Sequence, residues 1–265
     1  MTVEPAELLA LAELLATEVA ARLRASLAGS GPAISTKSTD TDLVTNLDLW
    51  AEDHIVARLR AARPDDAIFG EEGANIAGTS SVTWCIDPID GTVNFVHAIP
   101  GFCVSIAALV DGRAVAGVVA SPLHDEVFTA TLGGGAWCNG MRISCSEPPS
   151  LSRAIVATGF GYDPERRVRQ AEVVARTIGH IADIRRFGAA ALDLCWVAAG
   201  RVDAYWEVGL NPWDHAAGAL VAREAGAVVT GLDEDDPSEA FTLAAAPAIR
   251  EELAEVLRGA GAADV

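Results

Sequence analysis

Hydrophobic and polar residues follow two different patterns along this chain of 265 residues. In the first part, apolar residues at helical spacing predict a helix over residues 4–28, which the stretch "GSGPAIS" closes. A second helix is predicted over residues 46–62, and Pro64 ends its pattern. The polar stretch "STKSTDTDLVTN" between the two helices is typical of a loop.

Short apolar runs bounded by turn residues then predict strands. The run "AIFG" ends at Gly70, and "SSVTWCID" remains apolar up to Asp87. Asp111 and Gly112 separate two longer apolar runs, which is a strong signal for a tight hairpin. We therefore expect helices and a mainly antiparallel sheet in this part of the chain.

From about Leu151 onward, strand patterns alternate with helix patterns, which favours an α/β arrangement with some parallel pairing. The last helix is predicted near residues 247–257, with Pro247 at its first position. No low-complexity linker separates the two parts. We predict one domain over residues 1–265, with an α+β half at about 1–150 and an α/β half at about 151–265.

The composition excludes several classes of partner. No uncharged apolar stretch reaches 18 residues, so no membrane span is expected, and the acidic N-terminal segment does not resemble a signal peptide. These features predict a cytoplasmic protein. A net charge of −18 repels nucleic acids and anionic membranes. A phosphorylated small molecule could still bind if cations bridge it to the protein. The five scattered cysteines form no CxxC pair and are expected to be buried apolar residues.

Two acids in the stretch "WCIDPIDGTVNF" are hard to explain as core residues. Asp87 and Asp90 follow a buried strand, where a carboxylate is costly unless it is paired or binds a metal. No lysine or arginine lies within residues 82–100 to neutralise them. Pro88 stiffens the expected turn, so that both side chains and the Ile89 carbonyl can point to one place. Oxygen ligands of this kind suit Mg²⁺.

The residues that follow suit a phosphate group. Gly91 permits a close backbone approach to an anion, and Thr92 adds a hydroxyl and an N–H group at the start of a possible helix. A metal site beside a phosphate site indicates hydrolysis of a phosphate ester. The chain has no GxxxxGK[ST] loop, so a nucleotide kinase is not predicted.

Other acids have structural explanations as well as functional ones. Asp48 and Asp214 open helices, where acids commonly act as caps. A Glu71–Glu72 turn is usually solvated, and Glu207 could be a surface acid at a strand end. Arg185 and Arg186 could meet an anionic substrate, a dimer partner or solvent.

Five segments together carry a resemblance to a known family: "TKSTDTDLVTNLD", "GEE", "WCIDPIDGTVNFVH", "GAAALDLCWVAAGRVDAYWE" and "WDHAAGALVAREAGA". They occur in the same order in the inositol monophosphatase family of Mg²⁺-dependent, Li⁺-sensitive phosphatases, which the chain resembles over nearly its whole length. The resemblance implies a layered αβαβα sandwich of the α/β (α+β) class, usually found as a homodimer.

The resemblance also implies two or three Mg²⁺ ions in each active site. The implied ligands are Glu71, Asp87 and the Ile89 carbonyl for the first ion, and Asp87, Asp90 and Asp214 for the second. Glu71 would also approach a weaker third ion through water.

Further roles are implied for residues around the metals. Thr92, paired with Asp48, would orient and deprotonate the attacking water, and the Gly91 and Thr92 N–H groups would hold the phosphate. Lys37 lies in the matching loop near the metals, and Glu72 would support Glu71. The implied substrate contacts are Asp90, Ala190 and Glu207.

The implied function is an Mg²⁺-dependent phosphomonoesterase that hydrolyses inositol-1-phosphate or a similar polyol phosphate by in-line attack of an activated water. Val93 and the Asn211–Pro212 pair depart from common members, and the latter pair lies beside the expected substrate pocket. Histidinol phosphate, fructose 1,6-bisphosphate and nucleotide 3′-phosphates are alternative substrates within the superfamily. A non-catalytic regulatory or RNA-associated protein is the alternative outside it.

Overall fold

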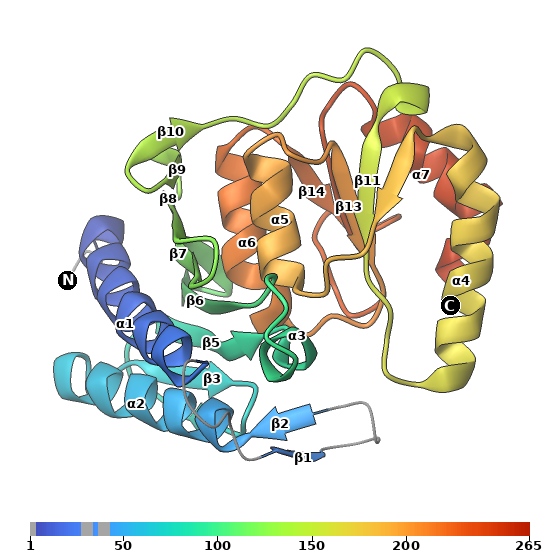
Figure 1. Cartoon of the computed structure of the whole chain (residues 1–265). Coiled ribbons are helices and arrows are strands. Elements are labelled where there is room, and N and C mark those ends of the chain that lie inside the picture. Colours follow the sequence, from blue (N-terminus) through green and yellow to red (C-terminus); the bar gives the residue numbers. More distant parts are fainter. Residues whose placement is uncertain (1–3, 28–33, 37–42) are drawn as a thin grey trace.

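The computed structural model describes residues 4–27, 34–36 and 43–265, which form five layers (Figure 1). From one side to the other these layers are α1 and α2, an eight-stranded sheet, α5 and α6, a five-stranded sheet, and α4 with α7. The predicted αβαβα sandwich is thereby confirmed. The helices are α1 (Pro5–Ser26), α2 (Asn46–Ala62), α3 (Thr92–Val96), α4 (Pro164–Thr177), α5 (Ala190–Ala198), α6 (Pro212–Glu224) and α7 (Arg250–Gly259).

The first sheet has the order β10-β9-β8-β7-β6-β5-β3-β4 and is antiparallel except where β3 pairs with β5. Its hairpin between β6 and β7 turns at Asp111 and Gly112, whose φ angles of 50° and 79° suit the two-residue turn predicted from the sequence. Its strands are β3 (Ala67–Gly70), β4 (Asn75–Ile76), β5 (Val82–Asp90), β6 (Cys103–Val110), β7 (Arg113–Ser121), β8 (Glu126–Thr131), β9 (Gly135–Cys138) and β10 (Met141–Ile143).

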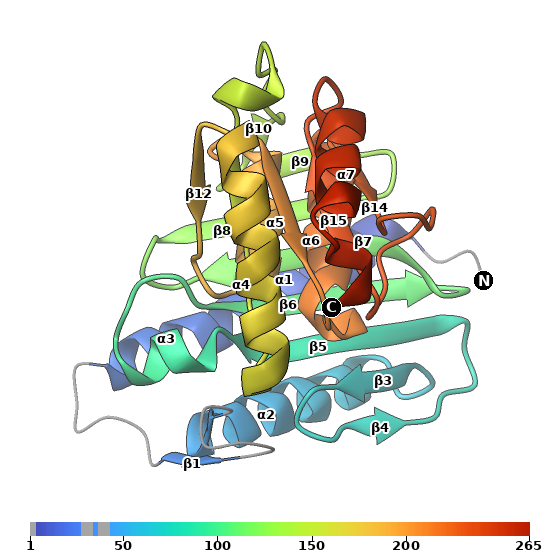
Figure 2. The ribbon, with the colours of Figure 1, turned by 90° about the vertical axis from the view of Figure 1, so that its right-hand side faces the viewer.

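The second sheet has the order β12-β11-β13-β15-β14, and β11 pairs in parallel with both β12 and β13. The predicted parallel pairing is confirmed. The strand β15, which lies between β13 and β14, was not predicted, because "TLAA" is short and lacks an alternating pattern when both of its faces are buried. The strands are β11 (Ile155–Thr158), β12 (Asp183–Arg185), β13 (Ala204–Glu207), β14 (Val228–Thr230) and β15 (Thr242–Ala245). Figure 2 shows α4 and α7 side by side on the outer face of this sheet.

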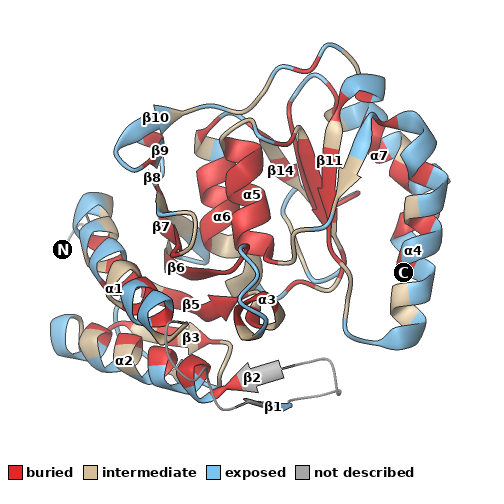
Figure 3. Ribbon diagram, in the orientation of Figure 1, coloured by how far each residue is buried: buried red, intermediate tan, exposed pale blue. Residues whose placement is uncertain are grey.

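The middle helix layer is the most buried part of the molecule (Figure 3). All residues of α5 are buried, as expected for a helix that is apolar on every side except at Asp193. Small residues let α6 approach the first sheet closely. A β-carbon built on Gly117 of β7 would lie only 3.1 Å from the Ala217 Cα. The N-terminal ends of α5 and α6 are thereby held between the two sheets.

Two predictions about local structure were wrong. The stretch predicted as a loop contains two short strands, β1 (Ile34–Thr36) and β2 (Leu43–Thr45), which pair with each other in antiparallel fashion. Such three-residue strands depend on their partner strand rather than on a sequence pattern of their own. The last helix begins at Arg250 and not at Pro247, because a turn closed by the Ile249 N–H on the Ala246 carbonyl comes first.

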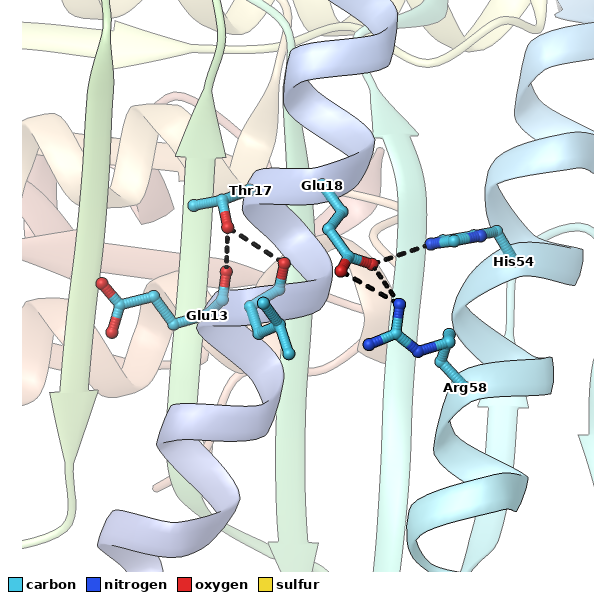
Figure 4. Close-up of polar contacts among 6 residues, drawn as sticks. Glu13, Thr17, Glu18, His54 and Arg58 are labelled. Carbon is cyan, nitrogen blue, oxygen red and sulfur yellow. Dashed lines mark hydrogen bonds and ion pairs between the residues drawn. The ribbon is translucent and has the colours of Figure 1, made fainter.

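An ion-pair cluster joins α1 and α2, the helices on the outer side of the eight-stranded sheet (Figure 4). The Glu18 carboxylate of α1 accepts hydrogen bonds from His54 Nε2 at 2.9 Å and from Arg58 Nη1 at 2.7 Å, both on α2.

No helix in the described parts of the chain combines the length and the apolar character needed to cross a bilayer.

Candidate active site

A cavity of about 410 Å³ lies where the ends of five elements meet: β5, β11, β13, α5 and α6. Segments distant in the sequence contribute five carboxylates and two guanidinium groups to its lining. The lining includes Glu71, Asp87, Ile89, Asp90, Gly91, Thr92, Gly159, Arg166, Arg186, Gly188, Ala190, Glu207, Gly209, Asn211, Trp213 and Asp214.

A larger cavity of about 560 Å³ lies between α1 and the β7–β8 turn. Its lining is mainly apolar, and its charged residues include Arg24 and Asp125, which pair with each other at 2.9 Å. It lacks the converging acids of the first cavity and is not the candidate site.

Asp87 and Asp90 are held at the end of β5 by an irregularity in the strand. Asp87 pairs with Ser105 and Asp90 with Cys103, so β5 has one extra residue between these pairs. The turn expected at Pro88 is therefore a bulge inside the strand, where a missing N–H group is tolerated. The bulge allows both acids to line the cavity. The Ile89 N–H donates to Asp87 Oδ1 at 3.0 Å.

Burial and mutual repulsion dominate the electrostatics of these acids. Burial, with the charges of Glu71, Asp90 and Asp214, raises the pKa of Asp87 well above its usual range. Burial also raises the pKa of Asp90 to about 7 and that of Asp214 well above normal. Among the described residues, no cationic side chain contributes to lowering the pKa values of Asp87, Asp90 and Asp214, and bound metal cations would favour their charged forms.

Their chemistry fits a hard divalent cation, because every candidate side-chain donor is a carboxylate oxygen. The acids share one cavity and influence one another electrostatically. Within the described residues, however, no group of three or more acidic, histidine or cysteine side chains is already arranged to hold a metal ion. The individual ligand assignments therefore stay predictions.

Thr92 and Asp48 come together from segments 44 positions apart. Thr92 Oγ1 lies 3.1 Å from Asp48 Oδ1 and 3.0 Å from the Ile89 carbonyl, so its single proton can reach either oxygen. The other oxygen, Asp48 Oδ2, accepts from the Thr45 N–H at 2.8 Å and the Thr45 hydroxyl at 2.6 Å. Asp48 therefore helps to cap α2 and also contacts Thr92, whereas its part in catalysis stays a prediction.

Asp214 likewise caps the start of α6 and lines the cavity. Its Oδ2 accepts the Asn211 N–H at 2.6 Å, as the third residue of a capping box does. Trp213 packs against Phe69 of β3, with ring centroids 4.9 Å apart. This contact places the first turn of α6 beside the strand that leads to Glu71.

The N-terminal end of α5 fixes the position of Asp90. The Ala190 N–H donates to Asp90 Oδ1 at 3.2 Å, and the Ala191 N–H donates to Oδ2 at 2.7 Å. Ala190 lines the cavity as predicted for a substrate contact, but its N–H group is already used by Asp90. Gly91 is in the left-handed region with φ 87°, and a β-carbon there would lie 2.9 Å from the Gly101 carbonyl. Only glycine fits this approach.

Glu52 was missed by the sequence analysis. This buried acid of α2 accepts the backbone N–H groups of Glu72 and Ala74, each at 2.8 Å, and so holds the turn that presents Glu71. Glu71 lines the cavity, whereas the described lining does not include Glu72. The sequence signal for Glu52 was its place on the helix face that carries Ile55 and Leu59, where a buried acid needs hydrogen-bond donors.

Glu207, at the end of β13, lines the same cavity and lies between Tyr205 and Gly159. Tyr205 donates its hydroxyl proton to Glu207 Oε2 at 2.5 Å, and Gly159 leaves space for the carboxylate. Burial raises the pKa of Glu207, although Tyr205, Arg186 and Arg166 act in the opposite direction. The sequence analysis did not identify Tyr205, Gly159 or Arg166.

The structure separates the two arginines that the sequence left equivalent. Arg185 forms an ion pair with Asp183 at 2.5 Å on the surface, whereas Arg186 lines the cavity. Lys37, predicted near the metals, lies outside the described residues.

Comparisons with known proteins agree with this architecture. Residues 4–262 match the inositol monophosphatase family. An inositol-1-monophosphatase SuhB from Mycobacterium tuberculosis is 46% identical over 274 residues, covering 96% of this chain and 94% of the relative. A Nus factor SuhB from Escherichia coli is 46% identical over 191 residues, covering 71% of this chain and 72% of the relative.

Solved structures show the same fold. The extragenic suppressor protein suhB from Bartonella henselae superposes with a TM-score of 0.90 at 36% identity, covering 95% of this chain and 98% of that one. A Thermotoga maritima IMPase superposes with a TM-score of 0.87 at 33% identity, covering 96% and 98% of the two chains.

The layered fold, together with these relatives, defines the chain as a phosphoric monoester hydrolase of a metal-dependent class. It belongs to the inositol monophosphatase family, as the resemblance of its motifs predicted.

Proposed function

We propose that the chain hydrolyses inositol-1-phosphate or a similar small polyol phosphate with the help of Mg²⁺. The observation that carries this proposal is the convergence of buried acids beside the Thr92–Asp48 pair in one cavity. Two or three Mg²⁺ ions would be held by Glu71, Asp87, the Ile89 carbonyl, Asp90 and Asp214. Bound Mg²⁺ would acidify the attacking water and neutralise charge on the phosphate and the leaving oxygen.

The chain's own residues would position the reactants and move the proton. The Thr92 hydroxyl would accept a proton from the attacking water as its own proton passes to Asp48 Oδ1, 3.1 Å away. Burial raises the pKa of Asp48, which makes its carboxylate a better proton acceptor. The Gly91 and Thr92 N–H groups would hold the phosphate, and Glu207 would accept hydrogen bonds from polyol hydroxyl groups.

The experiment is phosphate release from inositol-1-phosphate at increasing Mg²⁺ and after metal removal by a chelator. Activity should require Mg²⁺. Asp90→Asn should lower kcat/KM by more than about 100-fold, since loss of a mere supporting partner already costs roughly 10- to 100-fold in metal affinity or activity. Asp111→Asn, in the exposed hairpin turn, is the matched control and should leave activity unchanged. An active Asp90→Asn variant would contradict the ligand assignment.

A substrate panel decides between the alternatives within the superfamily. Inositol-1-phosphate should be compared with histidinol phosphate, fructose 1,6-bisphosphate and a nucleoside 3′-phosphate at saturating Mg²⁺. Preference for another compound by more than about tenfold in kcat/KM, or about 1.4 kcal/mol, would replace inositol-1-phosphate as the proposed substrate.

The name of the Escherichia coli relative, Nus factor SuhB, points to a different kind of role for that protein. For this chain, the net charge of −18 disfavours direct contact with nucleic acid phosphates, and the acids of the cavity favour catalysis. We therefore propose a small phosphorylated metabolite as the partner. Absence of phosphate release from every compound in the panel would favour the non-catalytic role.

The homodimer and the cytoplasmic location stay predictions from the sequence. Light scattering coupled to size-exclusion chromatography tests the first, and cell fractionation tests the second. A mass of about 27.5 kDa in solution would identify a monomer and contradict the dimer.

A further inference from the structure

Two arginines line the same cavity as the acids, at the end marked by Glu207. Arg166 belongs to the first turn of α4, and Arg186 directly follows β12. Among the described residues that line the cavity, these two carry its cationic side chains. They reach it from separate elements, so the fold brings them together.

Each guanidinium group lies against a glycine in the cavity wall. A β-carbon built on Gly209 would be 2.7 Å from Arg166 Nη1, and one built on Gly188 would be 2.3 Å from Arg186 Nη1. Larger residues at these two positions would displace the guanidinium groups. The bare glycine backbone therefore allows both groups to lie in the wall itself.

Within the described parts of the chain, neither guanidinium group takes part in a salt bridge. The salt bridges and side-chain hydrogen bonds of the described residues include Arg185 and Arg167, but not the guanidinium groups of Arg166 and Arg186. Both arginines lower the pKa of Glu207, so they lie near its carboxylate. Glu207 already receives the Tyr205 hydroxyl, and Arg186 also acts on the buried Asp193, whose pKa it lowers against the effect of burial.

Unpaired guanidinium groups at a cavity wall have a characteristic ligand. Their planar N–H groups bind phosphate or carboxylate oxygens through paired, charge-assisted hydrogen bonds. A neutral polyol such as the ring of inositol-1-phosphate would contact Glu207 but would bring no anionic acceptor to the two guanidinium groups.

We propose that Arg166 and Arg186 form an anion subsite at the Glu207 end of the cavity, which selects polyol or sugar phosphates with a second anionic group remote from the scissile ester. This inference rests on the proposed phosphatase function. The second group is a phosphate or a carboxylate.

The test compares pairs of substrates that differ only in the second anionic group. One pair is fructose 1,6-bisphosphate with fructose 1-phosphate, and the other is 6-phosphogluconate with sorbitol 6-phosphate. The second anion should raise kcat/KM of the wild-type protein at least about tenfold in one pair, as expected for hydrogen bonds between charged groups. The pair that responds identifies phosphate or carboxylate as the recognised group.

Variants then assign the effect to the two arginines. The selectivity ratio is kcat/KM of the substrate with the second anion divided by kcat/KM of its partner without it. Arg166→Ala and Arg186→Ala should each reduce this ratio by about tenfold, and the Lys variants should retain part of the selectivity. The matched controls are Arg169→Ala, on the exposed side of α4, and Arg185→Ala, which loses the surface pair with Asp183 and a hydrogen bond to the Ile184 carbonyl. Both controls should keep the wild-type ratio.

A wild-type ratio near one in both pairs would overturn the inference, even if an arginine variant failed to fold. If the arginine variants and the wild type had equal selectivity ratios, the inference would be overturned as well. The arginines would then only balance the negative charge of the cavity's carboxylates. Phosphate release from inositol-1-phosphate without an effect of the second anion removes this inference alone. No release from any phosphate ester removes the proposed function itself.

Discussion

The Glu207 carboxylate lies directly against the backbone of Gly159. A β-carbon at position 159 would be 1.8 Å from Glu207 Oε2 and 2.1 Å from Cδ. No real β-carbon approaches another heavy atom so closely, so any side chain at 159 must displace the carboxylate. Tyr205 holds the same oxygen from its own strand at 2.5 Å. The end of β11 and the end of β13 thereby fix one acid of the cavity.

Gly159→Ala should therefore move Glu207 and impair substrate binding with little loss of stability. We expect kcat/KM for a polyol phosphate to fall by about 10- to 100-fold, because a misplacement of about 1 Å is known to have effects of this size. Gly179→Ala is the matched control, since a β-carbon there meets nothing within 4 Å. Steady-state kinetics and thermal unfolding of both variants provide the measurement, and unchanged kinetics for Gly159→Ala would contradict a substrate role for Glu207.

Glu52→Gln should weaken metal binding without removing a predicted ligand. The amide cannot accept both the Glu72 and Ala74 N–H groups as the carboxylate does, so the turn that presents Glu71 should loosen. The Mg²⁺ concentration for half-maximal activity should rise roughly tenfold, the lower end of the usual effect of losing a supporting partner.

Activation by Mg²⁺ should be compared with that of Asp53→Asn, which changes an exposed acid on the same helix. Activation curves of Glu52→Gln and the wild type that coincide would show that the turn does not depend on Glu52.

Asp66→Asn should make stability less dependent on pH in the acidic range. Burial opposes ionisation of Asp66, but hydrogen bonds from Arg63, Ser80 and Trp84 outweigh it and lower its pKa. A lowered folded-state pKa stabilises the protein above the unfolded value of about 3.9, and this contribution is lost as the pH falls through the folded-state pKa.

The free energy of unfolding should therefore fall by about 2 kcal/mol in Asp66→Asn near neutral pH, and the difference from wild type should shrink below about pH 4. Urea unfolding at several pH values measures this change. Asp65→Asn, at the exposed neighbouring position, should follow the wild type. A difference that grows as the pH falls would contradict the assigned sign.

The Glu18–Arg58 pair between α1 and α2 should contribute much less (Figure 4). The two side chains are 33% and 42% exposed, so solvent screens their attraction. A double-mutant cycle of Glu18→Gln and Arg58→Gln should give a coupling of about 0.5 kcal/mol, which decreases at high salt. A salt-independent coupling above about 2 kcal/mol would mean that the pair is far better shielded than its exposure indicates.

Local sequence by itself determined most of the elements and the chemistry of the first acids. The helical spacing over residues 46–62 and the Asp111–Gly112 turn are local signals, and the structure confirms both. Asp87 and Asp90 stood out because a buried strand end without a nearby cation makes ionised acids costly. The motifs also determined the family, because their order is preserved over the whole chain.

Only the tertiary structure decided which distant residues meet. Glu52 holds the turn of Glu71, Gly159 leaves space for Glu207, and Arg166 reaches the same cavity as Arg186. None of these relationships has a short-range signature, because each joins segments that are distant in the sequence: α2 with the turn after β3, the end of β11 with the end of β13, and α4 with the segment after β12. Contacts across packed layers depend on the positions of whole elements, which spacing along the chain does not encode.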